Sequence, residues 1–209
     1  MFVAKTPKVV PPIAKHLLFK VPNPGNKVYL TFDDGPVPEA TPLVLDLLAE
    51  YHAKATFFCV GSNLDKHWHI AQRALDEGHT LGNHTQNHLN GWKTKNYSYY
   101  KNILEGQKHL EGTLFRPPYG RISPQQSIQI AKRYQIVMWD VLTGDYDRNR
   151  SADQCVKAVM DHTKPGSIIV MHDSKKALPN LESALPKILS WLCSKNYELA
   201  AIPLAIFQP

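Results

Sequence analysis

The sequence predicts an α/β domain in which helical crossovers connect the strands of a parallel sheet. Short apolar, β-branched runs alternate along the whole chain with segments whose apolar residues follow helical spacing. Parallel strands need such crossovers, so this alternation indicates repeated βα units. The chain has 209 residues, of which 43% are apolar and 20% charged, as expected for one folded domain. The number of units suits either a barrel of fewer than eight units or a doubly wound sheet.

The elements follow from local sequence, taken in chain order. Residues 1–26 read as an extended, proline-punctuated lead-in, and the apolar run 27–32 as a buried strand. The next segment, 40–51, has leucines three to four residues apart, which indicates an amphipathic helix. We expect further strands at residues 55–60, 80–82, 114–116, 136–141, 167–172 and 199–204. We expect further helices at residues 63–77, 99–110, 125–134, 152–162 and 177–194.

Composition narrows the classes of function. The net charge of +6 includes no dense basic block with interleaved aromatic residues, so we expect no nucleic-acid partner. No apolar run is long enough to cross a bilayer, and residues 1–20 lack a continuous apolar signal core. We expect either a cytoplasmic protein or an extracytoplasmic one whose leader has been removed, and a monomer. The three cysteines predict neither a disulfide framework nor a cysteine zinc site, and we expect them to be small buried side chains.

Two adjacent carboxylates end the first strand. Asp33 and Asp34 follow the run 28–32 and precede a Gly-Pro turn. In a parallel α/β sheet, the carboxyl ends of the strands form the working face. Carboxylates that are stripped of water need a partner, so this pair favours a nearby cation. The alternative is that both acids simply lie in a solvated turn.

Two histidines follow the third expected strand. His84 and His88 are four residues apart, which places both imidazoles on one face if the segment is helical. Two imidazoles and one carboxylate form the ligand set of a catalytic zinc or similar divalent site. The alternative is that the two histidines are solvated loop residues.

Other reactive groups follow later strands. The rigid stretch 116–119 (RPPY) gives Arg116 and the amide of Tyr119 defined directions, and such an N–H suits an oxyanion. His172 ends an apolar strand, where it could act as an acid or base that Asp145 orients. A structural turn and a satisfied core histidine remain the alternatives.

Several of these stretches together resemble the polysaccharide deacetylases, carbohydrate esterase family 4, which carry the NodB homology domain. Residues 31–35 (TFDDG) match the first family motif, residues 84–88 (HTQNH) the second and residues 116–119 (RPPY) the third. The resemblance extends from about residue 28 to residue 204.

The last two motifs match less closely. The fifth, an aliphatic residue two positions before a histidine, is met by Val170 and His172. The fourth is usually Asp-x-x-Asp-Trp, but here Leu142 and Tyr146 replace its outer residues while Asp145 is kept. In a member of this family, these two replacements would affect the shape of the substrate pocket.

The resemblance implies a distorted (β/α) barrel of about seven parallel strands over residues 27–209, in a single domain. It also implies that Asp34, His84 and His88 bind a divalent metal. Zn²⁺ is the first choice, with Co²⁺, Ni²⁺ or Mn²⁺ as alternatives.

The resemblance implies a hydrolytic N-deacetylase as well. Asp33 would be the general base and His172 the general acid. Arg116 would pair with Asp33, and Asp145 with His172. Tyr119 would offer its backbone N–H to the oxyanion.

The implied substrates are N-acetylated glycans such as chitooligosaccharides or peptidoglycan strands. Tyr119, Trp92, Val170 and Tyr146 are candidate substrate contacts, of which Trp92 lies in the aromatic-rich insertion 89–100. These aromatic side chains could stack on sugar rings or could pack the loop onto the barrel. Two other functions stay open: an amidohydrolase for small cyclic amides or ureides, and a non-catalytic glycan-binding barrel.

Overall fold

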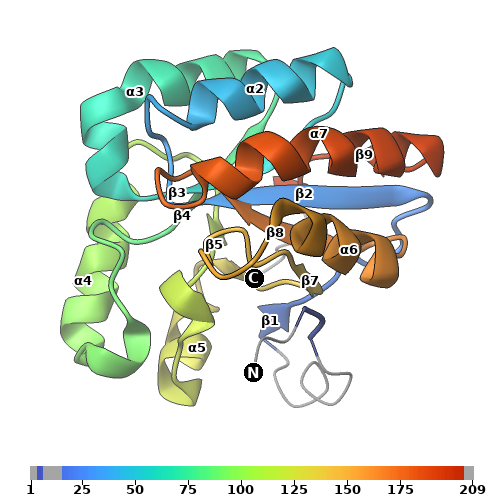
Figure 1. Ribbon diagram of the computed structural model, residues 1–209. Helices are drawn as coiled ribbons and strands as arrows, with labels where there is room; N and C mark the ends of the chain where they lie inside the picture. Colours follow the sequence, from blue (N-terminus) through green and yellow to red (C-terminus); the bar gives the residue numbers. More distant parts are fainter. Residues whose placement is uncertain (1–3, 7–15, 205–209) are drawn as a thin grey trace.

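The structure is a computed structural model that describes residues 4–6 and 16–204 (Figure 1). In these residues nine strands form one sheet in the order β1-β6-β5-β4-β3-β2-β8-β7, with β9 added beside the start of β2. All pairings between these strands are parallel. The sheet curves into a distorted, incomplete barrel within a single domain, so the predicted fold class is confirmed.

The elements lie close to their expected places. The strands are β1 (Leu17–Leu18), β2 (Lys27–Asp33), β3 (Thr56–Cys59), β4 (Thr80–Asn83), β5 (Leu114–Phe115), β6 (Gln135–Val137), β7 (Val141–Leu142), β8 (Ile168–His172) and β9 (Glu198–Leu199). The α-helices are α2 (Thr41–Glu50), α3 (Gly61–Asp76), α4 (Asn96–Gly106), α5 (Pro124–Ile130), α6 (Ala152–His162) and α7 (Leu178–Ser194). Two short 3-10 turns are η1 (Gly91–Lys93) and η2 (Pro118–Gly120). Figure 1 shows α2, α3 and α7 covering one side of β2, with α4 and α5 on the side of β4 and β5.

The central strand β2 divides its side chains between two environments. Leu30 and Phe32 belong to the main apolar core, which lies between the sheet and helices α2, α3, α6 and α7. Tyr29 points the other way, into a second core inside the barrel. Successive side chains alternate in a strand, so Thr31 and Asp33 share the inner face with Tyr29. This alternation aims Asp33 into the barrel.

The expected strand at residues 136–141 is wrong in one respect: it is two strands. β6 pairs with β1 and β5, whereas β7 pairs with β8 on the far side of the sheet. The N–H of Met138 donates to the carbonyl of Leu18 (2.7 Å), and the N–H of Asp140 donates to that of Ile168 (3.0 Å). The backbone therefore changes partners between residues 138 and 140, which the pattern of residues 136–141 does not reveal.

The two ends of the chain also depart from expectation. In the lead-in, Leu17–Leu18 joins the sheet beside β6, while residues 1–3 and 7–15 lie outside the described part. The closing strand is limited to Glu198–Leu199, and residues 205–209 lie outside the described part. Helix α5 ends at Ile130, four residues earlier than expected.

The cysteines and helices agree with part of the composition argument. All three cysteines are free thiols, but only Cys59 and Cys155 are buried. Cys193 is exposed, so the expectation that it is buried is wrong. No helix of the described residues combines the length and apolar character needed to span a bilayer.

Helix α4 holds the loop that carries both motif histidines. The N–H of Gln86 donates to the carbonyl of Asn102 (3.0 Å), and the N–H of Asn87 donates to its side-chain oxygen (3.0 Å). Gly106 lets the helix approach closely, because a Cβ there would lie 2.9 Å from the backbone carbon of Thr85. The position of the histidine loop therefore depends on the absence of a side chain at Gly106.

We expect Gly106→Ala to destabilise the protein by about 1–3 kcal/mol, because the new methyl group overpacks against backbone. Helix propensity alone would instead favour alanine by roughly 0.5–1 kcal/mol. Urea unfolding followed by circular dichroism measures the difference. Ser98→Ala, on the exposed side of the same helix, is the matched control and should change stability by about 0.5 kcal/mol or less. A Gly106→Ala variant more stable than wild type would contradict the packing argument.

Candidate active site

One cleft at the carboxyl ends of the strands gathers most of the predicted site. It has a volume of about 480 Å³, within the usual range for ligand pockets. Eight of the predicted residues line it: Asp33, Asp34, His84, His88, Tyr119, Tyr146, Val170 and His172. Arg116 and Asp145 are fully buried behind the lining, where each contacts one of these residues.

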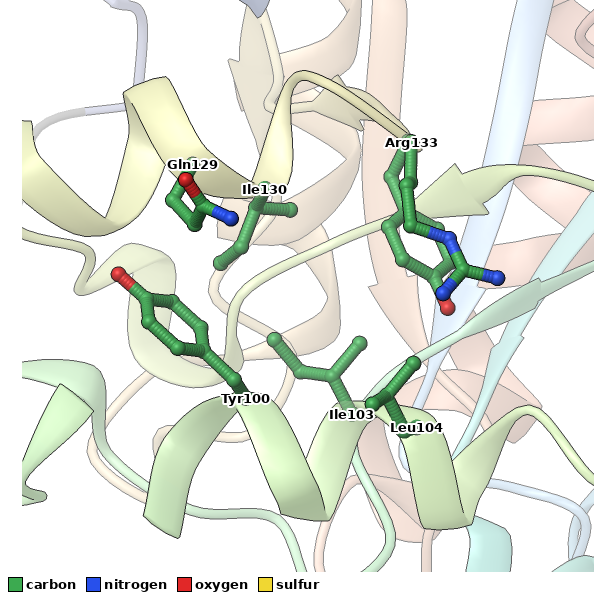
Figure 2. Close-up of a pocket in the computed structure, with 7 residues that line it drawn as sticks. Tyr100, Ile103, Leu104, Gln129, Ile130 and Arg133 are labelled. Carbon is green, nitrogen blue, oxygen red and sulfur yellow. The ribbon is translucent and has the colours of Figure 1, made fainter. Parts of the chain in front are cut away.

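A second, smaller cavity of about 180 Å³ lies between α4 and α5 (Figure 2). Figure 2 shows Tyr100, Ile103 and Leu104 on the α4 side of it, facing Gln129 and Ile130 on the α5 side. Its lining contains no carboxylate and no imidazole, and Arg133 is its one charged residue. It therefore lacks the acid, base and metal-binding groups that the larger cleft brings together.

Asp34, His84 and His88 form the one cluster of potential metal ligands found among the described residues. Their candidate ligand atoms all lie within 4.8 Å of one another. The Oδ1 atom of Asp34 is 3.0 Å from Nε2 of His88 and 3.7 Å from Nε2 of His84. Two neutral imidazoles and a carboxylate suit Zn²⁺ with an open coordination position, so the donor set fits a catalytic metal.

The protonation of this cluster also suits a cation. Nδ1 of His84 lies 2.7 Å from the carbonyl oxygen of Arg116, to which it donates when that nitrogen carries the proton. This leaves Nε2 facing the cluster. Burial lowers the pKa of His84 to about 4, so the ring is neutral at pH 7. For Asp34, burial opposes ionisation, but the hydrogen bond with His88 and the positive charge of His172 outweigh it and lower the pKa.

The loop between the two histidines is not helical. Thr85 and His88 have positive φ angles of 63° and 53°. The rings of His84 and His88 nevertheless come together, with centroids 5.0 Å apart. The helical condition under which the sequence placed both rings on one face is therefore not met, and the irregular loop achieves the approach instead.

Asp33 forms a buried ion pair beside this cluster. A guanidinium N–H of Arg116 donates to Oδ1 of Asp33 (2.7 Å), and the same nitrogen lies 2.7 Å from the hydroxyl oxygen of Thr31. Arg116 is fully buried and stacks over the ring of Phe58 at 4.1 Å. The pair fixes one oxygen of Asp33, and the carboxylate lines the cleft.

His172 is held by Asp145 from two directions. Its backbone N–H donates to Oδ2 of Asp145 (2.7 Å), and its Nδ1 lies 2.8 Å from Oδ1. Burial of the ring opposes protonation, but the charge of Asp145 and its hydrogen bond raise the pKa of His172 to about 9. The imidazole is therefore charged at pH 7 and directs Nε2 away from Asp145.

The remaining predicted residues lie on or beside the walls. Val170 and Tyr146 line the cleft, and the Tyr146 ring meets the His172 ring edge-on at 4.8 Å between centroids. Tyr119 sits against His88, with ring centroids 4.6 Å apart. Trp92 is 66% exposed and lies outside the lining of the cleft.

The sequence did not predict three further side chains of the lining: Arg121, Trp139 and Lys176. Arg121 stacks over Trp92 at 5.3 Å, and Lys176 lies 5.5 Å from the ring centre of Tyr146. Trp139 lies just past the end of β6, whereas the expected strand at 136–141 placed it inside the strand. The two cations had no sequence signal.

Comparison with known proteins identifies the family of this chain. The profile of the family described as polysaccharide deacetylase matches residues 20–139, more than half of the chain. The chain belongs to the polysaccharide deacetylase family. A peptidoglycan-N-acetylglucosamine deacetylase of Bacillus cereus is 35% identical over 195 residues, which cover 90% of this chain and 91% of that protein.

Two other members extend the comparison. A chitooligosaccharide deacetylase of Azorhizobium caulinodans is 34% identical over 157 residues, covering 71% of this chain and 74% of that protein. A crystal structure of a peptidoglycan N-acetylglucosamine deacetylase is similar with a TM-score of 0.84 and 35% identity, over 90% of this chain and 91% of that one. The family resemblance in the sequence is thereby confirmed.

We expect Asp145→Asn to lower the pKa of His172 from about 9 towards the ordinary value of 6.5, because the negative charge is lost. NMR titration of the His172 ring in metal-free protein measures this shift. A raised folded-state pKa stabilises the fold below pH 6.5, and this stabilisation disappears as the pH rises to about 9. Asp145→Asn should weaken that pH dependence.

The control removes an exposed carboxylate from another histidine. Asp65 contacts His109 at 2.8 Å on the surface, so Asp65→Asn should leave the titration of His172 unchanged. If His172 still titrates near pH 9 in Asp145→Asn, another group holds its proton.

Proposed function

We propose that this polysaccharide deacetylase removes acetyl groups from an N-acetylated glycan by metal-dependent hydrolysis. One observation carries the proposal: a single cleft holds a three-ligand cluster, flanked by the Asp33–Arg116 pair and the His172–Asp145 pair. Amide hydrolysis needs a proton acceptor for water and a proton donor for the departing nitrogen. These two pairs offer one group of each kind.

Asp34, His84 and His88 would hold the metal, with Zn²⁺ first and Co²⁺, Ni²⁺ or Mn²⁺ as substitutes. A divalent cation there supplies Lewis acidity, which polarises the acyl oxygen and acidifies the attacking water. The neutral state of His84 supports this role, because an imidazolium cannot donate a lone pair.

Asp33 would take the proton from the water as its oxygen attacks the acetyl carbon. Asp34 is committed to the cation, so the two neighbouring acids have separate duties. The Arg116 contact holds Oδ1 of Asp33, and its other oxygen is the base. Arg116 also places a positive charge beside this carboxylate.

The tetrahedral species needs a hydrogen-bond donor for its oxyanion as it forms and an acid for the nitrogen as it collapses. The backbone N–H of Tyr119 would donate to the developing oxyanion. His172 would give its Nε2 proton to the nitrogen as the C–N bond breaks, releasing acetate and a free amine. The contact with Asp145 supports this, because it keeps the ring protonated at neutral pH.

The names of the relatives support one class of substrate. They include deacetylases of peptidoglycan and of chitooligosaccharides, so we propose an N-acetylated sugar chain as the substrate. Val170 and Leu142 would contact the acetyl methyl group. Tyr146 would occupy the place of the tryptophan usual in the fourth motif.

We expect the purified protein with added Zn²⁺ to release acetate from N-acetylchitooligosaccharides or from peptidoglycan fragments. An enzyme-coupled acetate assay measures the rate, and a chelator should abolish it. No acetate from either glycan, at any of the four metals, would contradict the proposal. Hydrolysis of small cyclic amides or ureides instead would favour that alternative, and glycan binding without any turnover would favour a non-catalytic barrel.

The duties of the two acids can be separated. Asp33→Asn should keep metal binding and lower kcat by roughly 10²–10⁴-fold, as expected when a general base is lost. Asp34→Asn should lose metal and activity together. Calorimetric Zn²⁺ titration alongside acetate release distinguishes the two outcomes.

Glu39→Gln serves as the matched control, because Glu39 is an exposed acid on the loop after β2 whose partner is Lys175. It should retain both properties. Metal loss in Asp33→Asn with activity kept would reverse the assignment.

A further inference from the structure

The backbone at Asp34 is held in a conformation that an aspartate rarely adopts. Its φ angle is +82°, in the left-handed region that favours glycine. A residue held in such a sparsely populated region persists only where surrounding contacts fix it. The peptide groups on both sides of its Cα are therefore the place to look for those contacts.

The peptide that follows Asp34 is hydrogen-bonded at both ends. Its carbonyl oxygen accepts a hydrogen bond from the side-chain amide of Asn63 (2.8 Å), at the start of α3. Its N–H, which belongs to Gly35, donates to Oδ1 of Asp173 (3.0 Å). These two bonds fix the plane of this peptide and hence the ψ angle of Asp34.

The peptide that precedes Asp34 is held by the same residue. The backbone N–H of Asp173 donates to the carbonyl oxygen of Asp33 (3.1 Å). Asp173 thus forms hydrogen bonds with both peptides that flank the Cα of Asp34, one through its main-chain N–H and one through its carboxyl group. It directly follows His172 at the end of β8, the strand paired with β2.

The Asp173 side chain is itself fixed. It is 1% exposed, and the hydroxyl of Thr41 donates to its Oδ2 (2.6 Å). Thr41 in turn accepts a hydrogen bond from the N–H of Val37 (2.8 Å). A Cβ at Gly35 would collide with this carboxyl group, so glycine is needed for the approach.

We propose that Asp173 and Asn63 are positioning residues for the metal site: they hold Asp34 in its left-handed conformation and so direct its carboxylate at His84 and His88. The proposal rests on the proposed metal-dependent function. Neither residue is one of the three candidate ligands, and both act through the Asp34–Gly35 peptide. Residues that orient metal ligands typically contribute 10- to 100-fold to metal affinity.

The test measures metal affinity without substrate. Calorimetric titration of metal-free protein with Zn²⁺ alone should give an affinity about 10- to 100-fold weaker for Asp173→Ala than for wild type. Asp173→Asn keeps an acceptor for the Gly35 N–H, so it should restore most of the affinity. Asn63→Ala, which frees the other end of the same peptide and leaves the core intact, should also weaken binding.

A matched control separates positioning from stability. Asp140 is a buried carboxylate at the opposite ends of the strands, where it accepts a hydrogen bond from Ser167 (2.6 Å) and pairs with Lys20 (3.1 Å). Asp140→Ala should lower the melting temperature but leave Zn²⁺ affinity unchanged. The visible spectrum of the Co²⁺-loaded protein should change in Asp173→Ala and Asn63→Ala, but not in Asp140→Ala.

Wild-type Zn²⁺ affinity in folded Asp173→Ala and Asn63→Ala, or equal losses in the Asp140 control, would overturn the proposal. Acetate release is a separate measurement. If wild type binds Zn²⁺ with the expected order of variants but releases no acetate, the positioning role stands and the deacetylase proposal fails. If wild type binds no metal at all, both fail together.

Discussion

The site depends on the hydrogen bonds that the buried guanidinium of Arg116 makes. It donates four hydrogen bonds, to Thr31, to Asp33 and to two main-chain carbonyls that end β6. The main-chain carbonyl oxygen of Arg116 lies 2.7 Å from Nδ1 of His84. One residue thereby ties β2, β5, β6 and the histidine loop together. This fully buried charge is tolerated because acceptor oxygens are present for its N–H groups. Removal of its carboxylate partner would leave the charge uncompensated, at a cost of about 3–5 kcal/mol in stability.

Two histidines of the site show how the partner of a ring sets its charge. His84 and His172 each direct Nδ1 at an oxygen, which leaves Nε2 towards the cleft. The acceptor for His84 is a neutral carbonyl, so burial dominates and its pKa falls to about 4. The acceptor for His172 is the Asp145 carboxylate, whose charge outweighs burial and raises the pKa to about 9. A metal ligand needs the first state and a proton donor needs the second.

The sequence was most informative where chemistry follows a strand. Asp33 and His172 could be placed because buried runs end directly before them and parallel strands end at one edge. The division between β6 and β7 could not be predicted, because the pattern of residues 136–141, apolar except for Asp140, does not record which neighbour each half pairs with. The conformation of the loop from His84 to His88 could not be predicted either, since its positive φ angles depend on contacts with α4 and β5 rather than on local propensity. Lys176 and Arg121 were missed for a related reason: long exposed side chains reach the cleft from loops that have no sequence signature.

The two adjacent acids raise a geometric difficulty that the backbone resolves. In a regular strand, neighbouring side chains point to opposite faces, so a strand that aims Asp33 into the barrel would aim the next residue at the helices. Asp34 escapes this rule because β2 ends at Asp33 and its own φ angle is +82°. The turn to the left-handed region brings the second carboxylate back to the cleft, within 3.0 Å of His88. Two consecutive acids can therefore face one cleft only where the strand stops between them. Gly35, which follows the pair, leaves space for the Asp173 carboxyl group that stabilises this change of direction.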